Sequence, residues 1–242
     1  MALINGMKFL NLRMFVTDRF GAAAWTRITG ALTADERACV EAVEPVGWYD
    51  IDLSMKLTDR VCSSFDDDSY TLMQELGRFE ADREFATVHR WVLPLIEPQL
   101  AIQNMNVYWR RSNGTGTWTS RVDGHRVTAS LRDWAAIGSA NCYRVLGYLC
   151  RALQLFGARV DEPEHTKCRV RGDPACVFCA EIQLETILRE RGISISPIAT
   201  KRGHESRAPA ISRASSDGHD KCGLPPAAEN ELLSCSGSPA AE

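Results

Sequence analysis

The sequence predicts an α+β fold, with helices in roughly the first hundred residues and an antiparallel sheet after them. Apolar residues of the N-terminal region recur at three- and four-residue steps, which is typical of amphipathic helices. From residue 107 onward apolar and polar residues alternate around two turn dipeptides, Asn113-Gly114 and Asp123-Gly124. These are the dipeptides that most favour tight hairpins, and the alternation indicates strands with one buried face.

The N-terminal helices have recognisable ends. Phe9, Leu12, Val16 and Phe20 form one helical stripe that ends near Gly21, where a helix commonly stops. Thr33 is a candidate cap, because Asp35 and Glu36 follow in the first turn. The expected elements are helices at 9–20, 22–29 and from 34, a turn or short strand at 47–49, and helices at 53–63, from 70, and at 85–96.

The two turns predict a three-stranded antiparallel meander. Counting outward from them pairs Trp109 with Trp118, Val122 with His125, Ser120 with Val127 and Trp118 with Ala129. One face then carries the tryptophans and aliphatic residues, and the other carries mainly Arg and Thr. Two interpretations of this apolar face stay open. Trp109 and Trp118 are either ordinary core or the aromatic wall of a ligand pocket, with Ser120 and His125 as its polar groups. His125 lies beside a turn, where a solvated rim position is the alternative.

A further helix is predicted to begin at Ser139 as N-cap and to end near Gly157. Leu146, Leu149, Leu153 and Phe156 form its apolar stripe. Cys142 lies four residues before Leu146 and therefore faces inward with the stripe. In the first turn, free backbone amides and the helix dipole favour a thiolate.

The segment after this helix predicts a hairpin centred on Gly172, in the turn sequence Arg171-Gly172-Asp173-Pro174. Such a hairpin places Cys168 and Cys176 opposite each other. His165 stands three residues before Cys168, which in a regular strand is the opposite face. A bulge or kink near Pro163 would return it to the same face. Cys142, His165, Cys168 and Cys176 then form a set of three thiolates and one imidazole that suits tetrahedral Zn²⁺.

Two alternatives to a metal site stay open. Cysteines are among the most buried residue types and often serve only as small apolar side chains. Cys168 and Cys176 could instead form a disulfide, but a chain of nine cysteines without an export signal indicates reduced thiols. Cys179 is a rival ligand, since Cys176 and Cys179 form a Cys-x-x-Cys pair.

The spacing of the four residues resembles the 4-vinyl reductase type of ligand-binding domain. Twenty-two residues separate Cys142 from His165, two separate His165 from Cys168, and seven separate Cys168 from Cys176. The segment is especially similar to the aromatic-sensing domains of bacterial enhancer-binding activators, in which a Cys, an acidic residue and two further Cys hold zinc. His165 occupies the acidic position here. The resemblance covers about 42 residues, from Asn141 to Ile182, and implies a fold that encloses a small molecule between sheet and helices.

The composition is that of an ordinary soluble globular protein, with 45% hydrophobic and 24% charged residues and a formal net charge of −3. We therefore expect no nucleic-acid partner. No apolar run is long enough to cross a membrane, and charged residues interrupt the N-terminal apolar stretch, so we expect a cytoplasmic protein. A domain over residues 1–195 and a disordered tail over 196–242 are predicted, because the chain after Phe178 has no aromatic residue. A short helix over Gln183–Arg191 would close the domain.

These observations predict a sensory or binding module for a small apolar or aromatic molecule, with a structural zinc and no enzymatic activity. A homodimer or a signalling partner protein would receive the signal. One alternative is a haem-based gas sensor, since the superfamily includes haem–nitric oxide domains. Their Tyr-x-Ser-x-Arg signature is absent, because Tyr108-Trp-Arg110-Arg-Ser112 has the residue types in the wrong order. His89 is then the best axial candidate, and haem is disfavoured. A second alternative is an accessory protein of tetrapyrrole vinyl reduction, implied by the family name alone.

Overall fold

The N-terminal helices begin and end where the sequence places glycines and a capping threonine. The computed structural model describes residues 2–65, 70–86, 98–136 and 138–184. α1 (Met7–Phe20) ends at Gly21, whose φ of 84° is favourable for glycine. α2 (Ala22–Gly30) follows directly. α3 (Ala34–Glu41) begins with a complete capping box, in which the Glu36 N–H donates to the Thr33 hydroxyl and the Thr33 N–H donates to the Glu36 carboxylate.

A small two-stranded sheet and two longer helices follow. β1 (Leu3–Asn5) pairs with β2 (Trp48–Asp50) in antiparallel fashion, with Leu3 opposite Asp50. α4 (Ile51–Phe65) begins directly after β2, and α5 (Thr71–Ala86) is the next described helix. The helices and short strand predicted for this region are therefore confirmed where the structure describes them.

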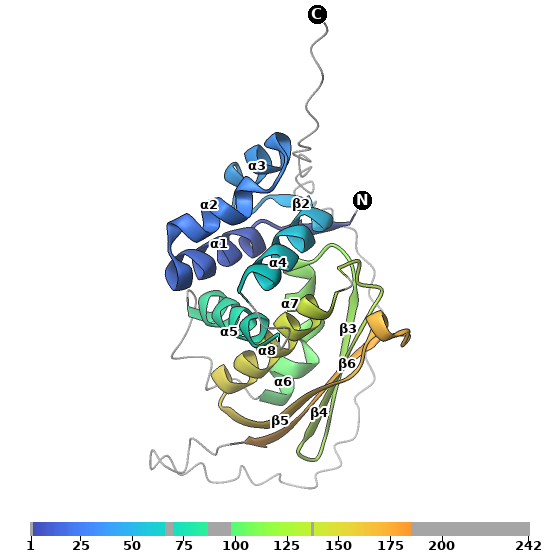
Figure 1. Ribbon diagram of the computed structural model, residues 1–242. Helices are drawn as coiled ribbons and strands as arrows, with labels where there is room; N and C mark the ends of the chain where they lie inside the picture. Colours follow the sequence, from blue (N-terminus) through green and yellow to red (C-terminus); the bar gives the residue numbers. More distant parts are fainter. Residues whose placement is uncertain (1, 66–69, 87–97, 137, 185–242) are drawn as a thin grey trace, which may run out of the picture. The chain divides into compact units, whose positions relative to one another are not determined.

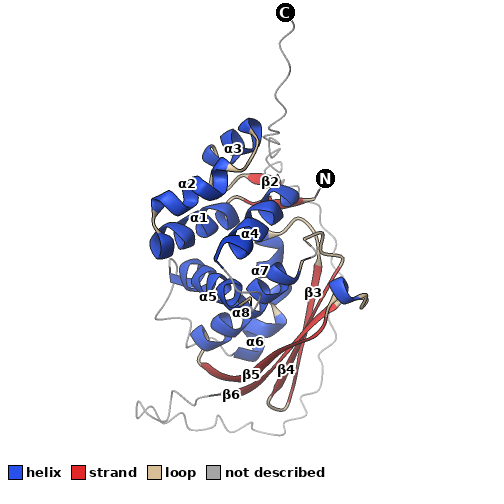
Figure 2. Ribbon diagram, in the orientation of Figure 1, coloured by secondary structure: helices blue, strands red, loops and turns tan. Residues whose placement is uncertain are grey.

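The main sheet has four antiparallel strands in the order β3-β4-β6-β5. They are β3 (Thr117–Asp123), β4 (Arg126–Arg132), β5 (Ala158–Lys167) and β6 (Cys176–Leu184). Helices α6 (Pro98–Gln103), α7 (Met105–Ser112) and α8 (Ser139–Leu155) lie beside this sheet (Figures 1 and 2). The helix-facing residues of β4 and β6 are buried, namely Val127, Ala129, Leu131, Phe178, Ala180 and Ile182. The predicted α+β class, with one buried face of an antiparallel sheet, is confirmed.

The first strand of the predicted meander is wrong, because residues 105–112 form helix α7. Asn113-Gly114 ends this helix instead of making a hairpin. The Asn113 N–H donates to the Trp109 carbonyl, and the Gly114 N–H donates to the Leu3 carbonyl, which joins the helix end to β1. Trp109 therefore does not pair with Trp118 along a strand. The alternation over only six residues was compatible with a helical face as well, because Met105, Tyr108 and Trp109 also recur at helical steps.

The second predicted hairpin exists, but its register differs from the prediction by two residues. Asp123 pairs with Arg126, and Trp118 pairs with Leu131, so the two-residue loop is Gly124-His125. Gly124 adopts a φ of 60°, which suits glycine at a tight turn. A shift of two keeps every side chain on its predicted face, because side chains alternate with a period of two.

Helices α5 and α8 cross at two glycines and pack backbone to backbone. A Cβ on Gly77 would lie 1.9 Å from the Arg144 carbonyl oxygen, and a Cβ on Gly147 would lie 2.1 Å from the Gln74 carbonyl oxygen. No larger residue fits at either position without moving a helix. This contact brings Glu80 of α5 beside Arg144 of α8, and the two form a buried ion pair. The crossing thus places the side chains that line the pocket described below.

Several predictions fall outside the described residues: most of the helix at 85–96, His89 and the tail over 196–242. The helix predicted from Gln183 is wrong at its start, since Gln183 and Leu184 continue β6. Within the described ranges, no helix combines the length and the apolar character needed to span a membrane.

Candidate metal centre and adjoining pocket

Cys142 enters the site from the first turn of α8. Gly138 is the N-cap, one residue before the predicted Ser139, and the Cys142 N–H donates to its carbonyl at 3.0 Å. Cys142 is 1% exposed and faces inward with Leu146, Leu149 and Leu153, as the periodicity predicts. The helix therefore holds this sulfur rigidly against the sheet.

A bulge in β5 brings His165 to the same face as the cysteines. His165 pairs with Phe178, whereas Lys167 pairs with Val177, so one extra residue on β5 separates the two pairs. Because of this extra residue, the three-residue step from His165 to Cys168 no longer reverses the face. His165 then lies on the buried face that Phe178 and Cys176 share. The kink expected near Pro163 is also present, as a register shift between Asp161 and Glu164.

The turn between β5 and β6 holds Cys168 in place. Cys168 is the N-cap of a single 3-10 turn, Arg169–Arg171, and its N–H donates to the Asp173 carboxylate at 2.7 Å. Gly172 closes the turn with a φ of 91°. Lys167 opposite Val177 continues the register that places Cys168 opposite Cys176. The hairpin is therefore centred as the sequence predicts.

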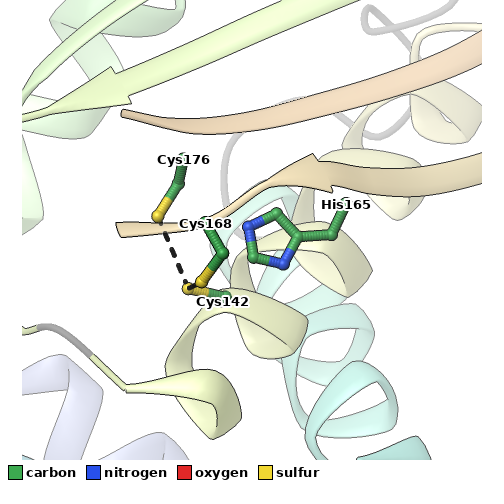
Figure 3. A group of neighbouring side chains, drawn as sticks. All are labelled: Cys142, His165, Cys168 and Cys176. Carbon is green, nitrogen blue, oxygen red and sulfur yellow. Dashed lines mark hydrogen bonds between the residues drawn. The ribbon is translucent and has the colours of Figure 1, made fainter. Parts of the chain in front are cut away.

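The four side chains converge on one point from α8, β5, the turn and β6 (Figure 3). Their ligand atoms all lie within 4.8 Å of one another. The Cys142 sulfur is 3.6 Å from the Cys176 sulfur and 3.9 Å from the Cys168 sulfur. Tetrahedral Zn²⁺ with Zn–S bonds of about 2.3 Å separates its sulfur ligands by about 3.8 Å. The spacing matches a shared metal ion and is far longer than a disulfide bond, so all three are free thiols.

The cluster already concentrates negative charge on one sulfur. The hydrogen bond from the Cys142 thiol lowers the pKa of Cys176 to about 4 against the effect of burial, and the neighbouring His165 contributes to the lowering. The same hydrogen bond, together with burial, raises the pKa of Cys142. Without a cation between them, the adjacent sulfurs of Cys142 and Cys176 cannot both ionise. A bound Zn²⁺ would supply that cation and deprotonate all three thiols.

His165 has a buried ring nitrogen that lacks a partner. In the part of the chain that the structure describes, its Nε2 makes no hydrogen bond. The ring stacks on Phe178 at 4.8 Å between centroids and meets Tyr143 edge-on at 6.0 Å. Figure 3 shows the ring turned toward the cysteines. A fixed imidazole with an unused buried nitrogen beside three thiols fits a metal ligand.

Cys179 does not belong to this cluster. Cys179 is three residues from Cys176 and one from Phe178 along β6. Because an odd step along a strand reverses the face, its side chain lies on the other face of the sheet. Its sulfur contacts the hydroxyls of Thr166 at 3.8 Å and Thr128 at 4.0 Å. The residues that could hold a metal are therefore Cys142, His165, Cys168 and Cys176.

A pocket is lined in part by α8, the helix that carries Cys142. It encloses about 690 Å³, a volume that includes its opening to solvent, between α1, α4, α5, α7, α8 and β3. Its wall is mainly apolar and aromatic, with Ile4, Met55, Met105, Tyr108, Trp109, Trp118, Trp134, Ala136, Val145, Tyr148 and Leu149. A mainly apolar and aromatic wall with a few polar groups is typical of small-molecule sites.

The sequence-predicted pocket residues have different placements. Trp109 and Trp118 both line the pocket, with ring centroids 5.5 Å apart, but Trp109 projects from α7 rather than from a strand. The Ser120 hydroxyl faces the Ile102 carbonyl and donates a hydrogen bond to it. His125 is exposed in the β3–β4 loop. The lining does not include Ser120 or His125.

Helical residues supply most of the polar lining, which sequence reasoning missed. Glu80, Glu84, Asn141 and Arg144 lie in the wall on α5 and α8, and Lys8 joins them from α1. Arg144 is 6% exposed and donates to both Glu80 carboxylate oxygens, to Thr58 and to the Lys8 carbonyl. Local periodicity gave no signal for Arg144, because it lies two residues from both Cys142 and Leu146 and therefore off the predicted apolar stripe.

A continuous aromatic stack connects the cluster to the pocket. His165 stacks on Phe178, Phe178 stacks on Trp118 at 6.0 Å, and Trp118 stacks on Trp109. Trp109 in turn meets Trp134 edge-on at 5.1 Å. A side chain of the metal cluster and a wall of the pocket thus share one packed row.

Comparison with known proteins finds similarity in structure. No protein-family model and no curated protein matches the sequence. One match is the crystal structure of a mutant H-NOX protein from Shewanella oneidensis in the Fe(II) ligation state. The TM-score is 0.61 and the sequence identity 14%, over 76% of this chain and 99% of that one. A mutant H-NOX protein from K. algicida, Fe(II) and unliganded, matches with a TM-score of 0.57 and 14% identity, over 77% of this chain and 100% of that one. The chain therefore has an H-NOX-like fold, and it carries a cluster of three cysteines and one histidine that could hold a metal.

Proposed function

We propose that this protein is a sensory domain of the 4-vinyl reductase type, which binds a small aromatic molecule and carries a structural zinc. The observation that carries the proposal is a largely aromatic pocket joined to a four-residue soft-ligand cluster by the stack of Trp118, Phe178 and His165. The fold supports it as a ligand-binding scaffold, although a fold by itself hosts many activities.

The zinc has a structural role in this proposal. Three cysteines and one histidine complete a tetrahedral shell, and structural zinc sites have four protein ligands. Catalytic zinc keeps an open position for water, which a complete shell does not provide. This donor set supports a binding protein rather than an enzyme, and it supports metal as the link between α8 and the final hairpin.

The pocket supports an aromatic ligand through its walls. Trp109, Trp118 and Trp134 pack around it with Tyr108 and Tyr148, and aromatic walls of this kind bind flat apolar molecules with favourable ring contacts. A change in the packing of α8 on ligand binding would be transmitted to a partner protein or to a second copy of the chain.

A haem-based gas sensor is the second candidate, favoured by the fold shared with H-NOX proteins in Fe(II) states. Against it, the pocket residues that the structure describes include no histidine or cysteine as axial ligand. An accessory role in tetrapyrrole vinyl reduction would also require a porphyrin-type ligand. Both candidates predict a coloured protein, whereas an aromatic sensor is colourless.

The deciding experiment is native mass spectrometry and absorption spectroscopy of the full chain purified from its own host under reducing conditions. We expect one zinc per chain, no Soret band near 400 nm, and quenching of tryptophan fluorescence when small aromatic compounds are added. Protein without metal would overturn the zinc site. A stoichiometric Soret band would replace the aromatic sensor with the haem candidate.

A further inference from the structure

Three buried N–H donors in the pocket wall lack a hydrogen-bond partner. They are Trp118 Nε1, Trp134 Nε1 and Asn141 Nδ2, and no described residue accepts from them. The three residues are 4%, 7% and 4% exposed, and all three line the pocket. Buried donors are nearly always paired in folded proteins, because leaving one unpaired costs about 1–3 kcal/mol. Three in one wall point to a ligand that accepts hydrogen bonds there.

Two other donors of the same wall are already paired. Trp109 Nε1, beside Trp118 and Trp134, donates to the Thr115 carbonyl at 3.0 Å. The Tyr148 hydroxyl donates to Glu84 at 2.8 Å. The unpaired donors therefore form a specific subset of the wall, contributed by β3, the segment after β4, and α8.

The charges of the wall disfavour an anionic ligand. The two cationic side chains described in the wall, Lys8 and Arg144, both form ion pairs with Glu80, which is 1% exposed. Glu84 adds a second carboxylate to the lining. A carboxylate ligand would bring a third negative charge into this space without a cation to receive it, which is costly in a desolvated site.

Resting on the proposed function, we infer that the pocket selects an uncharged aromatic molecule that bears a carbonyl-type oxygen. The oxygen accepts hydrogen bonds through its two lone pairs from two of the three donors of Trp118, Trp134 and Asn141, while the ring packs against the indoles. Carbonyl oxygens have two lone pairs and no proton, so they match unpaired groups that are all donors. A hydrocarbon of the same shape leaves these donors buried and unpaired.

The test compares three probes of nearly equal shape on the full chain by calorimetry and tryptophan fluorescence. Acetophenone carries the carbonyl, α-methylstyrene replaces its oxygen by a methylene group, and benzoate carries a negative charge. We expect acetophenone to bind on the order of tenfold or more tightly than either, because a site built from donors rejects an analogue that lacks the acceptor.

Matched variants assign the preference to the donors. Trp134→Phe and Asn141→Leu remove an N–H group with limited change in packing, so each should reduce the acetophenone to α-methylstyrene affinity ratio by about fivefold. Trp109→Phe is the control, because the N–H group that it removes already donates a hydrogen bond to the Thr115 carbonyl. It weakens both probes through lost ring contact and leaves their ratio unchanged.

Each outcome decides the inference. A high ratio that falls in Trp134→Phe and Asn141→Leu but not in Trp109→Phe supports it. Equal binding of acetophenone and α-methylstyrene overturns it and leaves the aromatic sensor intact, with water satisfying the donors. Tighter binding of benzoate also overturns it, in favour of an anion site. If none of the probes binds, the proposed function fails together with the inference.

Discussion

The metal cluster and the pocket both take residues from α8 but are built in different ways. All four cluster residues fall within 35 positions, from Cys142 to Cys176, and one helix, one bulge and one turn bring them together. The pocket takes its wall from positions between Ile4 and Leu149, on five helices, two strands and the segments after α7 and β4. A site encoded by short-range spacing can be predicted from the sequence, whereas a site formed by helix packing depends on long-range contacts.

The comparison predicts the largest effect for loss of the cluster. Cys168→Ser removes one of four ligands, and structural zinc contributes on the order of 10 kcal/mol to folding small sites. We expect the melting temperature to fall by more than about 10 °C and zinc to be lost, as measured by calorimetry and elemental analysis. Cys179→Ser is the matched control on the other sheet face, and it should retain zinc and shift the transition by only a few degrees. Equal effects of the two substitutions would contradict the four-ligand cluster.

The second effect concerns the ion pair in the pocket wall. Glu80→Gln leaves Arg144 charged and buried without its partner, which should cost about 3–5 kcal/mol of unfolding free energy in denaturant titrations. Burial opposes ionisation of Glu80, but Arg144 and Lys8 outweigh it and hold the pKa of the carboxyl below its usual value. The ion pair therefore contributes fully above a pH of about 4.3, the ordinary glutamate pKa, and its contribution is lost as pH falls further toward the folded-state pKa.

This pH dependence has its own check. The difference in unfolding free energy between the native chain and Glu80→Gln should be constant from pH 6 to 8 and shrink in acid. Arg19 and Glu75 form a more exposed ion pair, so Glu75→Gln is a matched control with an expected cost of about 1 kcal/mol or less. A gap between Glu80→Gln and the native chain that widens in acid would show that the sign of the pKa shift is wrong.

A smaller effect is expected at the helix crossing. Gly147→Ala places a Cβ 2.1 Å from the Gln74 carbonyl oxygen, so α5 and α8 must separate, at about 1–3 kcal/mol. Aromatic ligands should also bind more weakly, because both helices line the pocket. Gly30→Ala adds a Cβ with nothing within 4 Å and should be neutral or slightly stabilising. Unchanged stability and ligand affinity in Gly147→Ala would argue against the tight crossing.

The smallest effect tests whether the two sites are coupled. Because His165, Phe178 and Trp118 stack in one row, acetophenone binding should raise the zinc affinity, measured by competition with a chelator, about fivefold. Phe178→Leu should remove this gain while keeping all four metal ligands. The same gain in the native chain and in Phe178→Leu would mean that the sites act independently or communicate through α8 alone.

More of the metal cluster than of the pocket could be predicted from the sequence, because the cluster depends on local patterns. The hairpin centre at Gly172 and the inward face of Cys142 follow from local turn chemistry and helical periodicity, and the bulge at His165 was expected only in outline. The strand predicted at 107–112 is a helix, because a short alternating run satisfies both periods and its end is joined to β1 by the Gly114–Leu3 hydrogen bond. The pairing of Glu80 with Arg144 depends on contact between residues 64 positions apart, which no local pattern contains.

The glycine crossing also determines how a ligand signal can travel. Where Gly77 and Gly147 bring two backbones into contact, no layer of side chains remains that could repack as one helix slides on the other. α5 and α8 must therefore move as one body. Arg144 ties that body to α1 through the Lys8 carbonyl and to α4 through Thr58. A ligand that displaces α8 would thus shift the N-terminal helices together with it, which makes their outer surface the natural place for an output.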